Sequence, residues 1–259
     1  MFPPRRIVCL TEETVETLYL LGEQDRIVGI SGYTVRPPQA RRDKPRVSAF
    51  NSANIDKIIA LEPDLVLAFS DIQADIVADL IRRGIAVHAF NQRTLAEIFA
   101  MIRTLGALVG AGERADALAR SIEQRVAAAR AARPLHRPKV FFEEWDDPLI
   151  SGIGWVSELI EVAGGVDIFP ELAAGRAAKD RIVAPADVVA RAPDIIIGSW
   201  CGKKFRPEKV AARPGFDGVP AIRTGALHEI KSSFILQPGP AALTDGLDAM
   251  RRIIAAWRG

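Results

Sequence analysis

Two clusters of charged and aromatic residues follow β-like runs in the second half of the chain. They read Glu143-Glu144-Trp145-Asp146-Asp147 and Trp200-Cys201-Gly202-Lys203-Lys204-Phe205-Arg206. The carboxylates of the first cluster could act as general acid or base, and the cations of the second could hold an anion. The indole rings could cover the apolar face of a large ligand. The pattern predicts a binding site, with a catalytic site as the alternative.

The first half of the chain carries similar groups where strand-like runs end. Thr11-Glu12-Glu13-Thr14 follows the first run, Tyr33 follows the second and Phe69 ends a later one. Taken singly, each has a structural explanation: the two glutamates favour a helix N-terminus, and aromatic rings pack on the core. Because loops at the carboxyl ends of parallel strands form ligand crevices, the recurrence favours a site to which Tyr33, Phe69 and Phe234 add aromatic surface.

Thiol and imidazole groups suggest further chemistry. Lys203 and Lys204 lie close to Cys201 in sequence and could lower the pKa of its thiol, although no general base is evident nearby. The three histidines lack the spacing of metal ligands, so we expect neither a bound metal nor a required cofactor. A metal or haem carrier acting through His88, His228 or Cys201 is the third alternative.

The elements that must position these residues alternate between strands and helices. Short β-like runs cover residues 6–10, 26–31, 65–69, 86–90, 139–143, 195–200 and 226–231. This alternation is typical of parallel sheets. Residues 112–133 differ, because Leu118, Ile122 and Val126 recur at four-residue spacing in an alanine-rich stretch. We expect one helix there, about 20 residues and about 30 Å long, connecting two lobes.

An internal repeat supports the division into two lobes. Residues 60–68 read Ala-Leu-Glu-Pro-Asp-Leu-Val-Leu-Ala, and residues 190–198 read Ala-Arg-Ala-Pro-Asp-Ile-Ile-Ile-Gly. Each copy predicts a helix end, a Pro-Asp turn and a buried strand. Any two βα units share some likeness, but the repeat favours an α/β fold with two Rossmann-like lobes. The expected segments are a lobe over 1–111, the helix 112–133 and a lobe over 134–259.

Composition and charge exclude several classes of protein. Of the 259 residues 34 are basic and 32 acidic, so the net charge of +2 gives no field that would attract nucleic acid. No stretch reaches the roughly 18 consecutive apolar residues of a membrane span. The first six residues leave no room for a signal peptide, and Cys9 and Cys201 are expected to be reduced thiols. These features predict a cytoplasmic monomer, or a periplasmic one if a signal precedes this sequence.

Several longer motifs extend over nearly the whole chain. They include Arg6-Ile7-Val8-Cys9-Leu10-Thr11, Val28-Gly29-Ile30-Ser31-Gly32-Tyr33, Leu61-Glu62-Pro63-Asp64-Leu65-Val66, Leu159-Ile160-Glu161-Val162-Ala163-Gly164-Gly165 and Gln237-Pro238-Gly239-Pro240. In these motifs the sequence resembles the substrate-binding proteins of vitamin B12 and ferric-siderophore ABC importers. The resemblance implies two lobes joined by one long helix, with the ligand in the cleft between them. It also implies aromatic residues around a corrin, and Tyr33, Phe69 and Phe234 fall at matching places.

Two features depart from that family. Its members present an acidic residue from each lobe to the membrane partner, whereas this chain has Gln73-Ala74-Asp75 and Leu236 at the matching places. An ABC permease is therefore a predicted partner, although this chain lacks one of the two acidic residues that the family presents to it. The charged clusters also exceed what the resemblance requires, so the ligand need not be cobalamin itself.

We therefore predict a non-enzymatic protein that binds a small molecule, cobalamin or a similarly large, polar-edged ligand. The alternative is a cytosolic enzyme, or a factor that handles corrinoids or metal chelates, with Glu143 or Glu144 as acid or base. The predicted ligand-binding residues are Tyr33, Phe69, Glu143, Glu144, Trp145, Trp200, Lys203, Lys204, Arg206 and Phe234.

Overall fold

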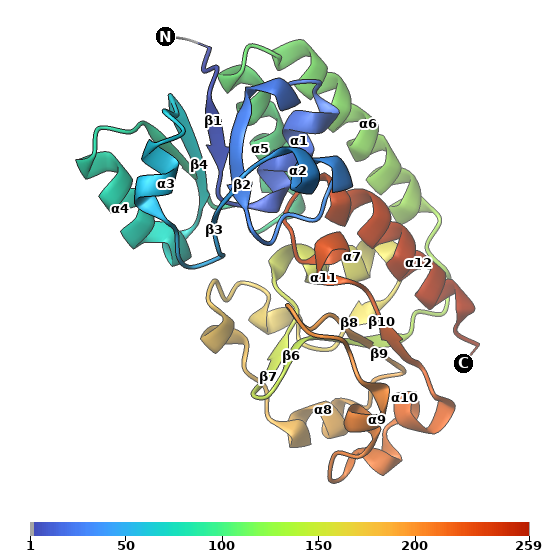
Figure 1. The fold of residues 1–259 in the computed structure, drawn as a ribbon. Helices are drawn as coiled ribbons and strands as arrows, with labels where there is room; N and C mark the ends of the chain where they lie inside the picture. The colour runs from blue at the N-terminus through green and yellow to red at the C-terminus, as the bar shows by residue number, and fades with distance from the viewer. Residues whose placement is uncertain (1–2, 259) are drawn as a thin grey trace. The chain divides into compact units, whose positions relative to one another are not determined.

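The computed structural model describes residues 3–258, which form two compact α/β units (Figure 1). Unit 1 comprises the residues up to Gln92 together with Ala96–Ile122. Unit 2 comprises Arg93–Leu95 together with the residues from Glu123 onward. Each unit contains one β-sheet, so the predicted α/β class with two Rossmann-like lobes is confirmed. No helix of residues 3–258 has the length and apolar character that crossing a membrane requires.

Unit 1 is built on a parallel sheet with the strand order β3-β2-β1-β4-β5. Its strands are β1 (Ile7–Cys9), β2 (Ile27–Ser31), β3 (Arg46–Ser48), β4 (Leu65–Phe69) and β5 (Val87–Phe90). Its helices are α1 (Glu12–Leu20), α2 (Pro38–Asp43), α3 (Ile55–Ile59), α4 (Ala74–Arg82) and most of α5 (Leu95–Leu108). Strand β4 is buried along its whole length, as expected for a central parallel strand covered on both faces.

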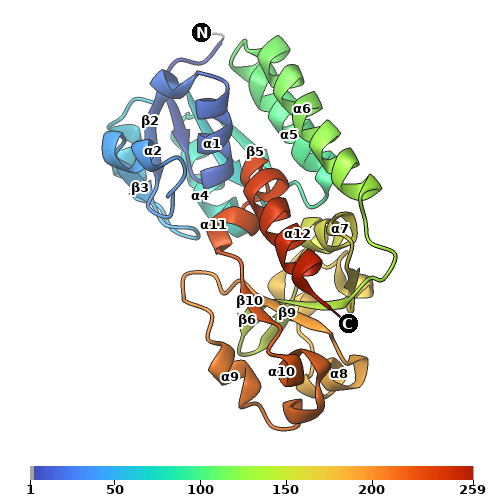
Figure 2. The same cartoon turned by 90° about the vertical axis from the view of Figure 1, so that its right-hand side faces the viewer.

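Unit 2 is built on a mixed sheet with the order β10-β9-β6-β7, in which β8 also pairs with β6. Its strands are β6 (Lys139–Asp146), β7 (Leu149–Ser151), β8 (Val166–Asp167), β9 (Ile195–Gly198) and β10 (Leu227–Glu229). Its helices are α7 (Gly154–Ala163), α8 (Pro185–Arg191), α9 (Pro207–Ala211), α10 (Pro220–Thr224), α11 (Ser232–Ile235) and α12 (Leu247–Ala256). Helix α12 packs beside α7 (Figure 2).

Strand β7 is an exception to the predicted parallel pairing. It runs antiparallel to β6, whereas β8, β9 and β10 pair in parallel with their neighbours. Only Asp147 and Pro148 separate β6 from β7. A connection this short permits a hairpin and excludes the long crossover that parallel strands need.

The helix predicted over 112–133 is α6 (Gly112–Ala131). It ends before Pro134, whose ring cannot continue a helix. Within unit 1 it runs beside α5 (Figure 2), where Arg103 Nε lies 3.0 Å from Asp116 Oδ1. The division between the two units falls within this helix, after Ile122.

The internal repeat of the sequence is also a repeat in structure. Glu62 and Ala192 take the same left-handed backbone conformation, with φ of 45° and 48°. The strands that follow, β4 and β9, pair in parallel with β1 and β6. In unit 1 the Asp64 carboxylate accepts from the backbone N–H of Arg6 at 2.9 Å. In unit 2 the Asp194 carboxylate accepts from that of Lys139 at 2.8 Å, so each Pro-Asp turn anchors the start of the neighbouring strand.

Candidate functional site

The carboxyl half of β6 carries a buried ion pair. Glu143 is fully buried, and its carboxylate accepts from Arg213 Nη1 at 2.6 Å and from Arg213 Nη2 at 2.8 Å. The indole N–H of Trp200 donates to Glu143 Oε1 at 2.8 Å. A bidentate pair of hydrogen bonds from a guanidinium group offsets the free-energy cost of burying a carboxylate. The geometry thus makes Glu143 an anchor for Trp200 and Arg213.

Glu144 forms a second ion pair of the same kind. Arg181 Nη1 and Nη2 donate to its two carboxylate oxygens at 2.7 and 3.0 Å. The Arg181 side chain is only 2 % exposed and also donates to the Ser151 carbonyl. This contact ties β6 to β7. A general acid or base needs a carboxyl oxygen that is open to substrate, whereas both oxygens of Glu143 and of Glu144 accept from a guanidinium group.

An ammonium group lies against two indole rings beside these ion pairs. Lys203 Nζ is 4.0 Å from the ring centre of Trp145 and 5.2 Å from that of Trp200, within the range of cation–π attraction. Lys203 also pairs with the Asp146 carboxylate. Trp145 is half-buried, and its indole N–H donates to the Asp147 carbonyl at 2.9 Å. The structure therefore brings together Trp145, Trp200 and Lys203, three of the predicted residues.

Trp200 itself is a core residue. It is 3 % exposed and packs edge-on against Phe205, with ring centres 5.1 Å apart. Gly198 at the end of β9 makes room for this contact, because a Cβ there would lie 1.9 Å from the Phe205 ring. Trp200 is therefore buried beneath Lys203, and the hydrogen bond from its indole N–H to Glu143 fixes its ring.

The remaining cations of the second cluster do not gather at the same place. Lys204 and Arg206 are exposed, and the Arg206 guanidinium lies 3.8 Å from Glu208 Oε1. The lowered pKa suggested for the Cys201 thiol is wrong. Burial and the Glu144 carboxylate raise its pKa instead, and the ammonium group of Lys203 is engaged with Asp146.

The aromatic candidates in unit 1 differ in exposure. Tyr33, in the segment after β2, is 59 % exposed, whereas Phe69 at the end of β4 is 4 % exposed. Phe69 donates its backbone N–H to Gln73 Oε1 at 2.9 Å. Gln73 is buried and also donates to the Phe50 carbonyl at 2.9 Å, so it has an internal structural role, whereas the neighbouring Asp75 is exposed on α4.

The last aromatic candidate lies in unit 2. Phe234 is half-buried on α11. The buried Trp155 fixes this short helix, because its indole N–H donates to the Ile235 carbonyl at 2.8 Å. Leu236, which stands at the second expected docking position, follows the end of α11 and is half-buried.

The first turn of α1 buries two carboxyl groups. Glu12 is 4 % exposed and Glu13 is 1 % exposed, and neither forms an ion pair with another of residues 3–258. Thr11 Oγ1 donates to Glu13 Oε1 at 2.6 Å, and the Val35 N–H donates to Glu12 Oε2 at 3.3 Å. Burial raises the pKa of Glu12 to about 8 and that of Glu13 to about 7. These groups therefore exchange protons near neutral pH.

Two of the histidines and Cys9 lie on strands. His88 is on β5 and His228 is on β10, and burial lowers the pKa of both. Cys9 is buried in β1, which raises the pKa of its thiol to about 12. Within the described range 3–258, no three His, Cys, Asp or Glu side chains form a group that could hold a metal ion.

Sequence reasoning missed the two arginines that organise the unit 2 site. Arg181 lies 37 residues from Glu144, and Arg213 lies 70 residues from Glu143. The available signal was chemical: two consecutive glutamates at the end of a buried strand require cationic partners. The sequence offers many arginines, and only the fold selects these two.

Comparison with known proteins places the chain in a family. Residues 7–234 match the family described as periplasmic binding protein. A cobalamin-binding protein of Halobacterium salinarum is 26 % identical over 92 % of this chain and 66 % of its own length. A vitamin B12-binding protein of Vibrio cholerae is 30 % identical over 66 % of this chain and 63 % of its own length. The chain thus spans slightly less than two thirds of these curated relatives.

Solved structures share the fold. The periplasmic heme-binding protein RhuT of Roseiflexus, in apo form, superposes with a TM-score of 0.82 at 23 % identity, over 96 % of this chain and 99 % of that one. The periplasmic vitamin B12 binding protein BtuF of Vibrio cholerae superposes with a TM-score of 0.77 at 22 % identity, over 98 % and 97 %. At such identities the likeness shows the fold alone.

These matches correct one expectation and confirm another. The cytoplasmic location expected from the start of the chain is wrong, because the matching family is described as periplasmic. In addition, a relative from Bacillus subtilis, 26 % identical over 97 % of this chain and 80 % of its own length, is described as an ABC transporter substrate-binding lipoprotein. The resemblance drawn from the sequence motifs is confirmed. The chain belongs to the periplasmic binding protein family.

Proposed function

We propose that this chain is the substrate-binding subunit of an ABC importer and that its ligand is a corrinoid or a similarly large, flat molecule with polar edges. The names of the relatives from Halobacterium and Vibrio support the ligand class. The observation that carries the proposal is the group formed by Trp145, Lys203 and Asp146 in unit 2. It combines an apolar ring with one positive and one negative group.

Each member of this group has a task in binding. The half-buried Trp145 offers indole surface for an apolar ring system. The Lys203 ammonium and the Asp146 carboxylate are a donor and an acceptor for the amide groups on the edge of a corrin. Glu143 and Trp200 act as positioning residues. Glu143 accepts from the Trp200 indole N–H, and the Lys203 ammonium lies 5.2 Å from the centre of that indole ring.

The other predicted residues have smaller proposed roles. Tyr33, with 59 % of its surface exposed, is available for stacking on a ligand from unit 1, and Phe234 adds a half-buried ring. Lys204 and Arg206 are exposed and act through general electrostatic attraction. Phe69 and Glu144 support the local structure around the strand ends.

The partner and the location follow from the same proposal. A membrane permease would receive the ligand, and the protein would work outside the cytoplasm, as the description of the Bacillus relative suggests. Asp75 on α4 is the exposed acid nearest to the expected docking position in unit 1. Charge reversal at Asp75 should weaken the docking of the ligand-loaded protein to the permease and leave ligand binding unchanged.

The test is a calorimetric titration with cyanocobalamin, with the corrin absorption bands recorded in parallel. We expect one-to-one binding, and we expect Trp145→Ala to weaken it by about 2 kcal/mol or more, as for a buried aromatic anchor. Tyr19→Ala is the matched control, because Tyr19 is also a half-buried aromatic residue but lies on α1, outside the predicted binding residues. Absence of cobalamin binding would overturn the ligand class. Binding that Trp145→Ala and Lys203→Met leave unchanged would overturn the site.

A further inference from the structure

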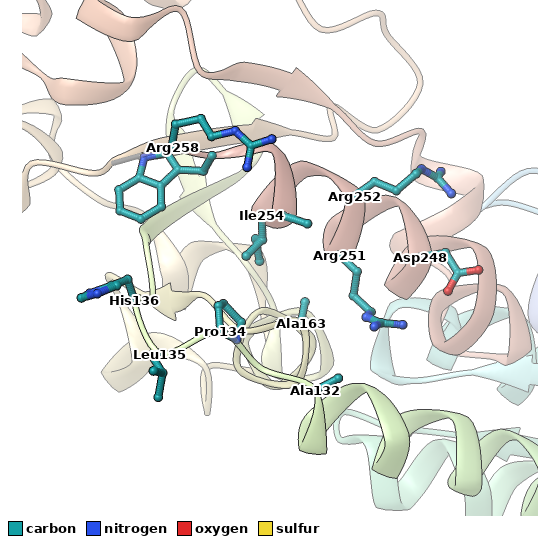
Figure 3. A pocket seen from close by; sticks show the side chains of 12 residues that line it. Ala132, Pro134, Leu135, His136, Ala163, Asp248, Arg251, Arg252, Ile254 and Arg258 are labelled. Atoms are coloured by element: carbon teal, nitrogen blue, oxygen red, sulfur yellow. The ribbon is translucent and has the colours of Figure 1, made fainter.

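A hollow of about 910 Å³ opens on unit 2 at a different place from the site proposed above (Figure 3). It is formed by the segment 132–136 that follows α6, by Ala163 at the end of α7, by helix α12 and by the two residues after that helix. The segment 132–136 leads into the amino end of β6, whereas Glu143 and Trp145 lie in its carboxyl half. The hollow therefore adjoins the opposite end of that strand, and its role is independent of the proposed function.

Part of the hollow is apolar. Pro134, Ala163 and Ile254 contribute aliphatic surface, and Trp257 adds a half-buried indole ring. Leu135, on the same segment, is 99 % exposed. Exposed leucine and indole surface beside a concave apolar wall is unfavourable in water unless something covers it.

The rest of the lining is strongly basic. Arg251, Arg252 and Arg258 line the hollow, and none of them pairs with an acid among residues 3–258. The one acidic lining residue, Asp248, already pairs with Arg125. In Figure 3 the three arginines extend from α12 and from the chain beyond its end. The lining therefore carries three positive charges without an acidic partner among residues 3–258.

The dipole of α12 does not explain this pattern. Cations are favourable in the last turn of a helix, but Arg251 and Arg252 lie in the middle of α12, whose last turn holds no basic residue, and Arg258 follows the helix. Nor does the dipole account for the apolar wall beside the three guanidinium groups. An anionic group joined to an apolar body satisfies both parts of the lining at once.

We propose that this hollow binds a small amphiphilic anion, a carboxylate or phosphate attached to an aliphatic or aromatic body. The Arg258 guanidinium would contact the anionic oxygens in the forked geometry that both groups accept, and Arg251 and Arg252, which point to different sides of α12 in Figure 3, would add electrostatic attraction. The apolar body would lie along Ile254 and Trp257 and would cover Leu135. The volume lies within the roughly 300–1,000 Å³ that is usual for small-molecule sites.

The experiment is a calorimetric titration of the full chain with octyl phosphate and octanoate, both below their micelle concentrations. We expect one-to-one binding of at least one of them, with a dissociation constant at least tenfold below those for inorganic phosphate and for octanol. Arg258→Gln and Trp257→Ala should each weaken binding about tenfold, the size of one charge-assisted hydrogen bond or one buried ring. Arg223→Gln, an exposed arginine on α10, is the matched control and should leave binding unchanged.

Three outcomes would overturn the proposal. Equal binding of octyl phosphate and inorganic phosphate would show a general cationic surface with no apolar component. Binding to phosphatidylglycerol vesicles without binding of the monomeric amphiphiles would show that a membrane surface is the partner. Binding that responds equally to Arg223→Gln and Arg258→Gln would show dependence on net charge alone. Circular dichroism of each variant distinguishes loss of the site from loss of the fold.

Discussion

The two units have similar α/β folds but differ in how they stabilise glutamates that are removed from water. Two consecutive glutamates belong to each of the counterpart strands β1 and β6: Glu12-Glu13 begin the helix that follows β1, and Glu143-Glu144 lie in the carboxyl half of β6. In unit 2 each glutamate accepts two hydrogen bonds from the guanidinium group of one arginine. In unit 1 neither glutamate pairs with a cation among residues 3–258, and burial raises both pKa values.

This difference separates two physical solutions to one problem. A buried carboxyl is tolerated when a cation compensates it or when it keeps its proton. The stability of unit 2 should therefore depend on its arginines, and that of unit 1 on pH. The tryptophans make the comparison measurable, because Trp145, Trp155, Trp200 and Trp257 all lie in unit 2 and tryptophan fluorescence follows that unit.

The largest expected effect comes from breaking the buried pair in unit 2. Arg213→Met leaves the fully buried Glu143 carboxylate without its guanidinium partner. Removing one partner of a buried ion pair costs about 3–5 kcal/mol. We expect a loss of this size in the free energy of unfolding, measured by urea titration with tryptophan fluorescence.

Two variants sharpen this prediction. Arg206→Met removes an exposed arginine 3.8 Å from Glu208, where a loss of about 0–1 kcal/mol is expected. Adding Glu143→Gln to Arg213→Met removes the uncompensated charge while keeping an acceptor for the Trp200 indole, so it should restore most of the stability. A loss below about 1 kcal/mol for Arg213→Met would contradict the proposed difference between the units.

The second prediction concerns the titrating acids of unit 1. The pKa of Glu12 rises from 4.5 to about 8 on folding, so between these values the folded state holds the extra proton. Its contribution to stability is complete below pH 4.5 and is lost as the pH rises through 8. Glu12→Gln should remove this dependence, which amounts to about 1.4 kcal/mol per pH unit at most. Urea unfolding followed by far-ultraviolet circular dichroism at pH 6 and pH 8 measures it.

The control for Glu12→Gln is an exposed acid in the same unit. Glu113→Gln, at the start of α6, should leave the dependence of stability on pH unchanged. Glu13, with a pKa of about 7, has the same sign as Glu12, so Glu13→Gln should flatten the dependence between pH 4.5 and pH 7. Wild-type stability that rises from pH 6 to pH 8 in the unit 1 transition would show that these carboxyls are ionised in the folded state.

Local sequence predicts the scaffold better than the site. The run at 65–69 coincides with β4, and the helix predicted from 112 begins there as α6, because periodicity and turn residues act between near neighbours. The groups that neutralise Glu143 and Glu144 are selected by loops that return from distant parts of the chain. The burial of Glu12 could not be predicted from the sequence either, because a glutamate in the first turn of a helix is usually solvated.

The third prediction tests a packing difference between the repeats. Gly198 at the end of β9 corresponds to Ala68 in β4, which is fully buried and carries its Cβ without conflict. A Cβ at Gly198 would overlap the Phe205 ring, so Gly198→Ala should destabilise unit 2 by about 1–3 kcal/mol. Gly218→Ala, where a Cβ meets nothing within 4 Å, is the control. Combining Gly198→Ala with Phe205→Leu should recover part of the loss in tryptophan-detected unfolding.

The smallest expected effect distinguishes the two Pro-Asp turns. The Asp64 carboxylate accepts from two backbone N–H groups, those of Arg5 at 2.7 Å and Arg6 at 2.9 Å. Asp194 accepts from Lys139, and the residue before Lys139 is Pro138, which has no N–H to donate. An asparagine retains one acceptor oxygen, so it can replace Asp194 but leaves one N–H unsatisfied when it replaces Asp64.

Asp64→Asn should therefore cost about 1 kcal/mol, the value of one hydrogen bond, and Asp194→Asn about 0.5 kcal/mol or less. Urea unfolding measures both losses, with circular dichroism for the first variant and tryptophan fluorescence for the second. Equal losses would mean that charge, rather than the number of N–H donors, sets the strength of the turn. A larger loss at Asp64 would show that the two copies keep one fold with different numbers of hydrogen bonds, because Pro138 before β6 lacks the N–H that Arg5 donates before β1.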